Sequence, residues 1–299
     1  MSKLTMLYTK KDTFMTKTIS KLEVFDVESK SRTVIKTFPY LIEAPNWTPD
    51  GKWFVFNSNG RLYKLPHDGS GEPEEIYSGI ATRCNNDHVI SSDGKLIAVS
   101  HHSASDNNSR IYTLPFEGGE ATEITPIGPS YLHGWSPDMR HMAYCAFRGN
   151  AHVVHTLDLA SGIETAHTKS EDGLSDGPEY SPDGKYIWFN WVKTGLMQIW
   201  RMKADGSEQT QMTFDEDLNS WFAHVSPDGK QVVYVAYHKG NLKPDEHLPN
   251  KSVVLRMLPA EGGTPTTIVE LFGGQGTINV NSWAPDSKRF AFVSYELSE

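Results

Sequence analysis

The stretch Ser181-Pro182-Asp183-Gly184-Lys185 occurs six times along the 299-residue chain, intact or altered. The other copies lie at residues 48–52, 91–95, 136–140, 226–230 and 284–288. Their aspartates are spaced 43, 45, 45, 45 and 58 residues apart. A period of this length matches one four-stranded blade of a β-propeller, so the repeat predicts an all-β ring.

Each copy lies between two runs that are typical of strands. The proline presets φ, the aspartate can cap a turn and the glycine accepts a positive φ, so each copy predicts a tight hairpin turn. Apolar residues then alternate, as at Ile187 and Phe189, and a period of two indicates a strand. A third strand and a short polar fourth strand follow, so each repeat predicts a four-stranded antiparallel blade.

The two ends of the chain predict how the ring closes. The last copy leaves 13 residues after Asp286, enough for one more strand at residues 289–295. Residues 21–26 and 33–37 resemble a third and a fourth strand with no first or second strand before them. We expect these N-terminal strands to complete the C-terminal half blade. This gives six blades, a single domain over residues 1–299 and no free sheet edge.

One insertion departs from the repeat. The fifth and sixth copies are separated by 13 residues more than the usual 45, and we place the excess at residues 237–251, between the second and third strands of the fifth blade. Long loops on a tight repeat are usually functional or disordered. The two prolines and the single glycine of residues 238–250 favour an ordered lid.

Composition argues against several classes of function. A net charge of −9 disfavours a surface for nucleic acid or anionic membrane. No apolar run approaches the ~20 residues of a membrane span, and the first residues lack the apolar core of a secretory signal, so we expect a cytoplasmic protein, with a periplasmic one as the alternative if a leader has been removed. The two cysteines, Cys84 and Cys145, fall in different repeats and predict buried free thiols. The sequence leaves the oligomeric state open.

The repeated phrase also carries a family likeness. With Trp47, Trp135, Tyr180 and Trp283 just before it, the phrase resembles the TolB-like propeller repeat, a WD40-like PD repeat, over all six copies. This resemblance implies a six-bladed propeller. More distantly, the chain resembles the oligogalacturonate lyases, whose family implies a propeller with a histidine-rich metal site on one face.

The residues just before each turn are expected to ring one mouth of the central channel, where repeat rings commonly hold ligands. Polar groups are frequent there. Seven positions before each aspartate the chain has Glu43, Asn86, Tyr131, Asp176, Trp221 and Asn279. Five positions before it the chain has Pro45, His88, His133, Pro178, Ala223 and Asn281. Four positions before it the residues include Asn46, Glu179 and His224.

Histidines are concentrated at this mouth. Seven of the twelve are predicted to lie on one face: His88, His101, His102, His133, His224, His238 and His247. Neutral imidazoles can hold a divalent metal, and the candidate metal ligands are His224, His238 and His247. The candidate ligand-binding residues are His88, His101, His133, Asp176, Glu179, Trp221, Asn86 and Asn281. The alternatives stay open: a single histidine is more often a hydrogen-bonded channel residue, and Asp176 and Glu179 could cap turns.

Two functions fit this pattern. The first is a binding module that holds a protein segment or a small polar ligand at the histidine-rich mouth, and it agrees with the absence of a Gly-x-Ser-x-Gly motif. The second is a metal-assisted carbohydrate-active enzyme, a lyase or hydrolase of oligosaccharides, with a divalent metal as its cofactor. No catalytic residue is assigned, and the six repeat aspartates are interpreted as turn residues on the opposite face. We favour the binding module, because a fold alone does not define a function.

Overall fold

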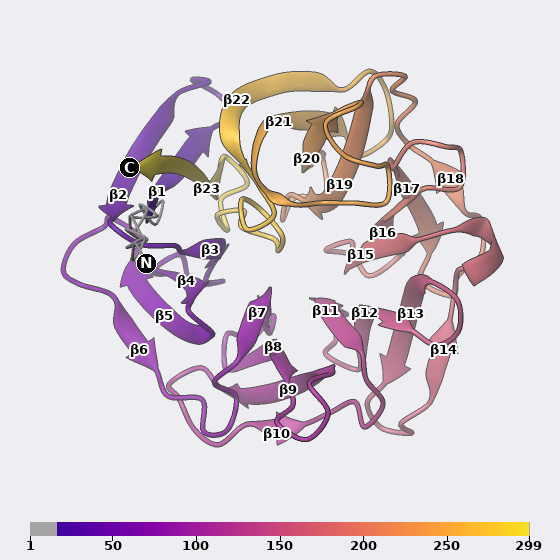
Figure 1. Cartoon of the computed structure of the whole chain (residues 1–299), viewed down its shortest axis with the longest axis horizontal. Coiled ribbons are helices and arrows are strands. Elements are labelled where there is room, and N and C mark those ends of the chain that lie inside the picture. Colours follow the sequence, from indigo (N-terminus) through magenta and orange to yellow (C-terminus); the bar gives the residue numbers. More distant parts are fainter. Residues whose placement is uncertain (1–16, 299) are drawn as a thin grey trace, which may run out of the picture.

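The computed structural model describes residues 17–298, which form a closed ring of six antiparallel sheets around a central channel (Figure 1). Blade 1 consists of β3 (Glu43–Trp47), β4 (Trp53–Ser58), β5 (Arg61–Pro66) and β6 (Glu74–Ile76). Blade 2 consists of β7 (Cys84–Ile90), β8 (Leu96–His102), β9 (Ser109–Pro115) and β10 (Thr122–Glu123). Blade 3 consists of β11 (Ser130–Trp135), β12 (His141–Phe147), β13 (His152–Asp158) and β14 (Glu164–Ala166).

The remaining blades follow the same order from the centre outward. Blade 4 consists of β15 (Ser175–Tyr180), β16 (Tyr186–Trp191), β17 (Gln198–Lys203) and β18 (Thr210–Gln211), and a 3₁₀ turn η1 (Ser170–Asp172) precedes it. Blade 5 consists of β19 (Leu218–Val225), β20 (Gln231–His238), β21 (Pro249–Pro259) and β22 (Thr266–Gly274). The loop between β20 and β21 is the insertion that the repeat spacing predicted.

The closing blade joins the two ends of the described chain. β1 (Lys17–Asp26) lies between β2 (Arg32–Phe38) and β23 (Arg289–Ser298) in a three-stranded sheet. On the inner side of this sheet, the segment before the last turn pairs with β23 through a single β-bridge, between Trp283 and Phe290. Figure 1 shows β1 and β23 side by side, which confirms the predicted closure and the six blades. Residues 1–16 and 299 lie outside the described residues, so the predicted domain ends and the predicted lack of a secretory signal stay predictions.

The repeated phrase forms the turn between the first and second strands of each blade. In the copy at residues 91–95, Oδ1 of Asp93 accepts hydrogen bonds from the Ser91 hydroxyl at 2.7 Å and the Lys95 N–H at 3.1 Å. Gly94 has a φ of 71°, the left-handed conformation that glycine adopts without strain. The aspartates are therefore used by the turn itself.

A register shift interrupts the innermost strand of each of the first five blades, in β3, β7, β11, β15 and β19. A β-bulge places an extra residue in one strand and re-aims the side chains beside it. Simple alternation therefore does not predict which inner-strand residues face the channel.

Apolar side chains fill the spaces between neighbouring blades. One cluster joins Trp221 and Val233 of blade 5 to Phe290 of the closing blade, and five further clusters are distributed around the ring. Cys84 and Cys145 are free and buried, as predicted. Within residues 17–298, the structure contains no helix with the length and apolar character needed to cross a membrane.

Candidate functional site

A cavity of about 420 Å³ opens at the centre of the ring, on the face that carries the loops between second and third strands. We call it the loop-side cavity. Its wall combines apolar side chains with titratable side chains from different blades: Asp87, Tyr131, His133, His152, Asp176, Phe222 and His247. The inner strands and the inserted loop thus bring together groups that lie up to 160 residues apart in the sequence.

His133 of β11 and Asp176 of β15 form the central ion pair of this cavity. Nε2 of His133 lies 3.1 Å from Oδ1 of Asp176, and both residues are buried. Burial opposes protonation of His133, but the Asp176 and Asp87 carboxylates outweigh it and raise the pKa of the imidazole. For Asp176, burial is outweighed by His133, by His247 and by the Gly177 N–H, which together hold the pKa of the carboxyl well below its usual range.

Asp87 of β7 is the second buried carboxyl of the cavity, with only 4% of its surface exposed. Its Oδ2 accepts a hydrogen bond from Nδ2 of Asn85 at 2.5 Å. Burial and the negative charges of Asp176 and Glu43 raise the pKa of Asp87 to about 6, against the opposing effect of His133. Perturbed acids of this kind are concentrated at functional sites.

The inserted loop supplies His247 to the wall of the cavity. Its Nε2 lies 3.8 Å from Oδ2 of Asp176, and its ring packs on Trp221 with the ring centroids 4.4 Å apart. Burial lowers the pKa of His247. Its buried Nδ1 has no hydrogen-bond partner among the described residues, and neither does the buried Nε2 of His152.

Phe222 forms part of the wall from the bulge of β19. Its ring stacks on His133 with the centroids 5.6 Å apart, and its φ is 58°. A positive φ is rare for a bulky residue and is usually found where the surrounding structure enforces it. Here the Phe222 N–H donates to Oδ1 of Asn190 at 3.1 Å, which helps to hold this conformation.

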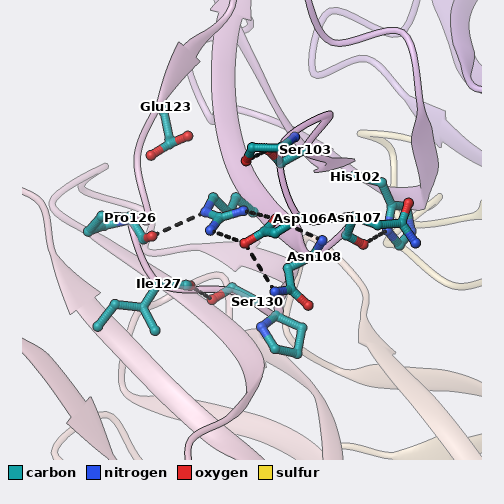
Figure 2. A network of polar contacts seen from close by, with 12 residues as sticks. His102, Ser103, Asp106, Asn107, Asn108, Glu123, Pro126, Ile127 and Ser130 are labelled. Atoms are coloured by element: carbon teal, nitrogen blue, oxygen red, sulfur yellow. Dashed lines mark hydrogen bonds and ion pairs between the residues drawn. The ribbon is translucent and has the colours of Figure 1, made fainter.

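The rim of the cavity at blade 2 is fixed by a polar network (Figure 2). Arg110 binds both carboxylate oxygens of Asp106, at 2.8 and 2.7 Å, and this hydrogen bonding keeps the pKa of Asp106 well below its usual range. Nδ1 of His102 donates to the carbonyl oxygen of Asn107 at 3.2 Å, because a carbonyl can only accept. The network therefore holds His102 at the rim through Nδ1.

A second cavity, of about 350 Å³, opens on the opposite face. We call it the turn-side cavity, because prolines and tryptophans of the repeated turns line it: Pro49, Pro137, Pro182, Pro227, Pro285, Trp47, Trp135 and Trp283. His133 lines both cavities and thus lies between them in the channel.

The polar groups at the base of the turn-side cavity are largely paired with one another. The Glu179 carboxylate accepts from Nδ2 of Asn281 at 2.7 Å and from the Val225 N–H at 3.1 Å. His224 contacts Oε2 of Glu179 through Nδ1 at 2.7 Å and the Ile278 carbonyl through Nε2 at 2.9 Å. Only Oδ1 of Asn46, among the groups that line this cavity, is buried without a partner in the described chain.

Four of the predicted ligand-binding residues lie outside both cavities. His88 is fully buried, and its Nε2 lies 3.4 Å from the Val55 carbonyl of blade 1. Nδ1 of His101 accepts from the Arg83 N–H at 3.1 Å, and Asn86 donates to Glu43 at 3.3 Å. Trp221 is also fully buried and lies behind two lining residues of the loop-side cavity, His247 and Phe222, with ring centroids 4.4 and 5.7 Å away.

The three predicted metal ligands do not come together. Both ring nitrogens of His224 face oxygen acceptors, so neither has a free lone pair for a metal. His238 is exposed at the end of β20, and His247 lies in the loop-side cavity. Across residues 17–298, no group of three or more His, Cys, Asp or Glu side chains is arranged to hold a metal ion. The described residues therefore do not fit the metal site that the lyase resemblance implies.

Sequence reasoning missed several residues of the loop-side cavity, among them Asp87, His152 and Phe222. Asp87 directly precedes the predicted His88, and the register shift between Cys84 and His88 makes Asp87 the cavity residue. Phe222 similarly follows the predicted Trp221. A bulge recognised at this repeat position of the inner strands would have identified both residues. Only blade 4 has a glycine at that position, Gly177.

Comparison with known proteins places the chain in a family. Residues 133–253 match the family described as the TolB β-propeller domain, PD40. An uncharacterized protein of Agrobacterium fabrum is 44% identical over 276 residues, which is 92% of each chain. A solved structure from Agrobacterium tumefaciens, provisionally named TolB, has a TM-score of 0.89 and 43% identity over 93% of this chain and 99% of that chain. The chain belongs to the TolB-like β-propeller family.

More distant structures share the fold alone. TolB from Acinetobacter baumannii has a TM-score of 0.68 at 18% identity, over 87% of this chain and 65% of that chain. An oligogalacturonate lyase solved in complex with manganese has a TM-score of 0.52 at 13% identity, over 84% of this chain and 67% of that chain. Both resemblances predicted from the repeats are confirmed at the level of the fold.

Proposed function

We propose that this TolB-like propeller is a binding module whose loop-side cavity holds a small polar ligand or a side chain of a protein segment. One observation carries the proposal: Asp87, His133, Asp176 and His247 converge on one cavity from four different blades. A channel filled only for packing would not concentrate buried titratable groups in this way, because their burial is costly without partners.

Buried nitrogen atoms that lack a hydrogen-bond partner support the same proposal. Nδ1 of His247 and Nε2 of His152 are buried at this cavity without partners in the described chain. Buried polar atoms in native proteins are nearly always paired with protein, water or a ligand. The cavity volume of about 420 Å³ falls within the range of small-molecule sites, about 300–1,000 Å³.

A metal-assisted lyase or hydrolase has less support. Its predicted ligands His224 and His238 lie outside the loop-side cavity, and the likeness to the lyase concerns the fold alone. A binding role requires no group beyond those already described.

A ligand screen tests the binding role. The full chain is heated with a panel of amino acids, amines, neutral sugars and short peptides, and Tm is compared with that of Phe222→Ala, which opens the cavity wall. A ligand that binds only the native state raises Tm by mass action. We expect at least one class to raise Tm of the unmodified protein and to have a smaller effect on the variant. Equal shifts in both proteins, or no shift from any class, would contradict the proposal.

We place the protein in the cytoplasm as part of this proposal. The two buried free thiols, Cys84 and Cys145, agree with a reducing compartment. Cell fractionation followed by immunoblotting tests the location, and recovery of the protein outside the cytoplasmic fraction would overturn it.

A further inference from the structure

We propose that the ligand of the loop-side cavity carries an ammonium or guanidinium group that binds the Asp87 carboxylate. This inference rests on the binding function proposed above and names the chemistry of its ligand. The cation can come from a free small amine or from a lysine or arginine side chain of a protein segment, and the experiment below separates these two sources.

Pairing within the cavity singles out Asp87 as the carboxylate available to a ligand. Asp176 has His133 at 3.1 Å and His247 at 3.8 Å. Asp87 forms no ion pair with any Lys, Arg or His of residues 17–298, and the only donor that reaches its side chain is the neutral amide of Asn85. A buried carboxylate without a cation is costly, and a ligand cation is the group that would offset this cost.

The charges around Asp87 favour a cation over an anion. Glu43 and Asp176 are acidic neighbours that raise the pKa of Asp87, and the imidazole that opposes them, His133, is already paired with Asp176 at 3.1 Å. His102, His152 and His247 line the same cavity, and burial favours the neutral form of His247 by lowering its pKa. The one imidazole that lies within 3.1 Å of a carboxylate here serves Asp176, so a cationic ligand would supply the positive charge that Asp87 lacks.

The apolar part of the wall indicates that the cation is attached to a carbon stem. Tyr131, Leu174 and Phe222 line the cavity beside the carboxylates. Burial raises the pKa of Tyr131, so its phenol stays neutral and its ring can contact a cation. An alkyl or aryl amine would pair its charge with Asp87 and bury its stem against these side chains.

Titration calorimetry with matched probes tests the proposal on the full chain. Phenethylamine and agmatine represent free amines, and N-acetyl-lysine amide, alone and within a short peptide, represents a protein segment. Phenylethanol is the neutral analogue of phenethylamine. We expect cationic probes to bind at pH 7, with affinity at least about tenfold lower for the neutral analogue and for Asp87→Asn. Asp93→Asn, an exposed turn variant, is expected to bind as the unmodified protein does.

A second readout is the pH dependence of binding. Protonation of Asp87 competes with the cation, so affinity for phenethylamine is expected to fall by roughly tenfold from pH 7 to pH 5 in the unmodified protein and by much less in Asp87→Asn. If free amines bind, the source is a small molecule. If only the lysine peptide binds, the source is a protein segment.

Three results would overturn this inference while leaving the binding function in place. The first is equal binding of phenethylamine and phenylethanol, and the second is a neutral sugar or peptide that binds the cavity while no cation does. The third is unchanged cation affinity in Asp87→Asn. The binding function itself fails in a different way, when no class of ligand raises Tm.

Discussion

The two mouths of the channel are built from the same inner strands, but their polar groups differ in how completely they are paired with one another. At the turn side, Glu179, His224 and Asn281 satisfy one another through short hydrogen bonds. At the loop side, Asp87 has no cationic partner and His247 has a buried nitrogen without a partner in the described chain. His133 lies between the two cavities and lines both.

This difference distinguishes groups that stabilise the ring from groups kept for a ligand. A buried charge that is paired and fully hydrogen-bonded contributes to the native state, and its removal leaves its partners unpaired. A buried charge without a partner costs stability, and a protein retains it where a ligand completes the site. The two mouths should therefore respond in opposite directions to the loss of a carboxylate.

The largest effect is expected at Glu179. Glu179→Ala leaves His224, Asn281 and the Val225 N–H without their acceptor, so the free energy of unfolding should fall by about 3–5 kcal/mol. Urea denaturation measures this change. Glu179→Gln is the matched control, because its amide oxygen still accepts, and it should cost less than the alanine variant. A loss below about 1 kcal/mol for Glu179→Ala would contradict the paired description.

Asp87→Asn should instead raise the free energy of unfolding. The folded protein holds the pKa of Asp87 at about 6, above the value of about 3.9 in an unfolded chain. The ionised side chain therefore costs stability at pH 8, and the amide should raise the free energy of unfolding by about 1–3 kcal/mol. Urea denaturation at pH 8 measures it, and destabilisation by Asp87→Asn would show that the carboxylate has a partner.

The pH dependence of that difference follows from the same pKa. Because the folded state binds the Asp87 proton more tightly than the unfolded state does, the Asp87 contribution becomes less favourable as pH rises from about 4 to about 6. The stability difference between Asp87→Asn and the unmodified protein should vanish below about pH 4 and reach its full value above about pH 6. A difference that is constant across this range would contradict the assignment.

The smallest effect is expected at the exposed turns. In Asp93→Asn the amide oxygen can still accept from the Ser91 hydroxyl and the Lys95 N–H, so stability should change by less than about 1 kcal/mol. Ligand binding at either mouth should not change. A larger loss, or altered binding, would mean that the turn aspartates have a role beyond their own turns.

The sequence predicts the fold well because each repeated turn is determined by its own few residues. Each Pro-Asp-Gly phrase specifies its own turn, and the alternation after it specifies a strand, so blade number and closure follow from counting copies. The insertion at residues 237–251 also falls where the structure has the loop that carries His247.

The site is less predictable, because the direction of each inner-strand side chain depends on a bulge. Alternation from the turn predicts His88 at the channel, whereas the register shift in β7 places Asp87 there and His88 against the Val55 carbonyl. Ala44 and Phe222 adopt positive φ at the same repeat position as Gly177, and neither residue type signals that conformation. His133 and Asp176 line the cavity, but their pairing joins β11 and β15 of two neighbouring blades, and the sequence of neither strand specifies that contact.

The most direct test of the whole account is the pKa of Asp87, measured by following its carboxyl ¹³C resonance from pH 3 to pH 9, with the resonance assigned by its loss in Asp87→Asn. We expect a midpoint of about 6, together with a shift to lower pH when a cationic ligand is added. A midpoint at the ordinary aspartate value of about 3.9 would mean that Asp87 is already paired or solvated, and it would contradict the contrast between the two mouths.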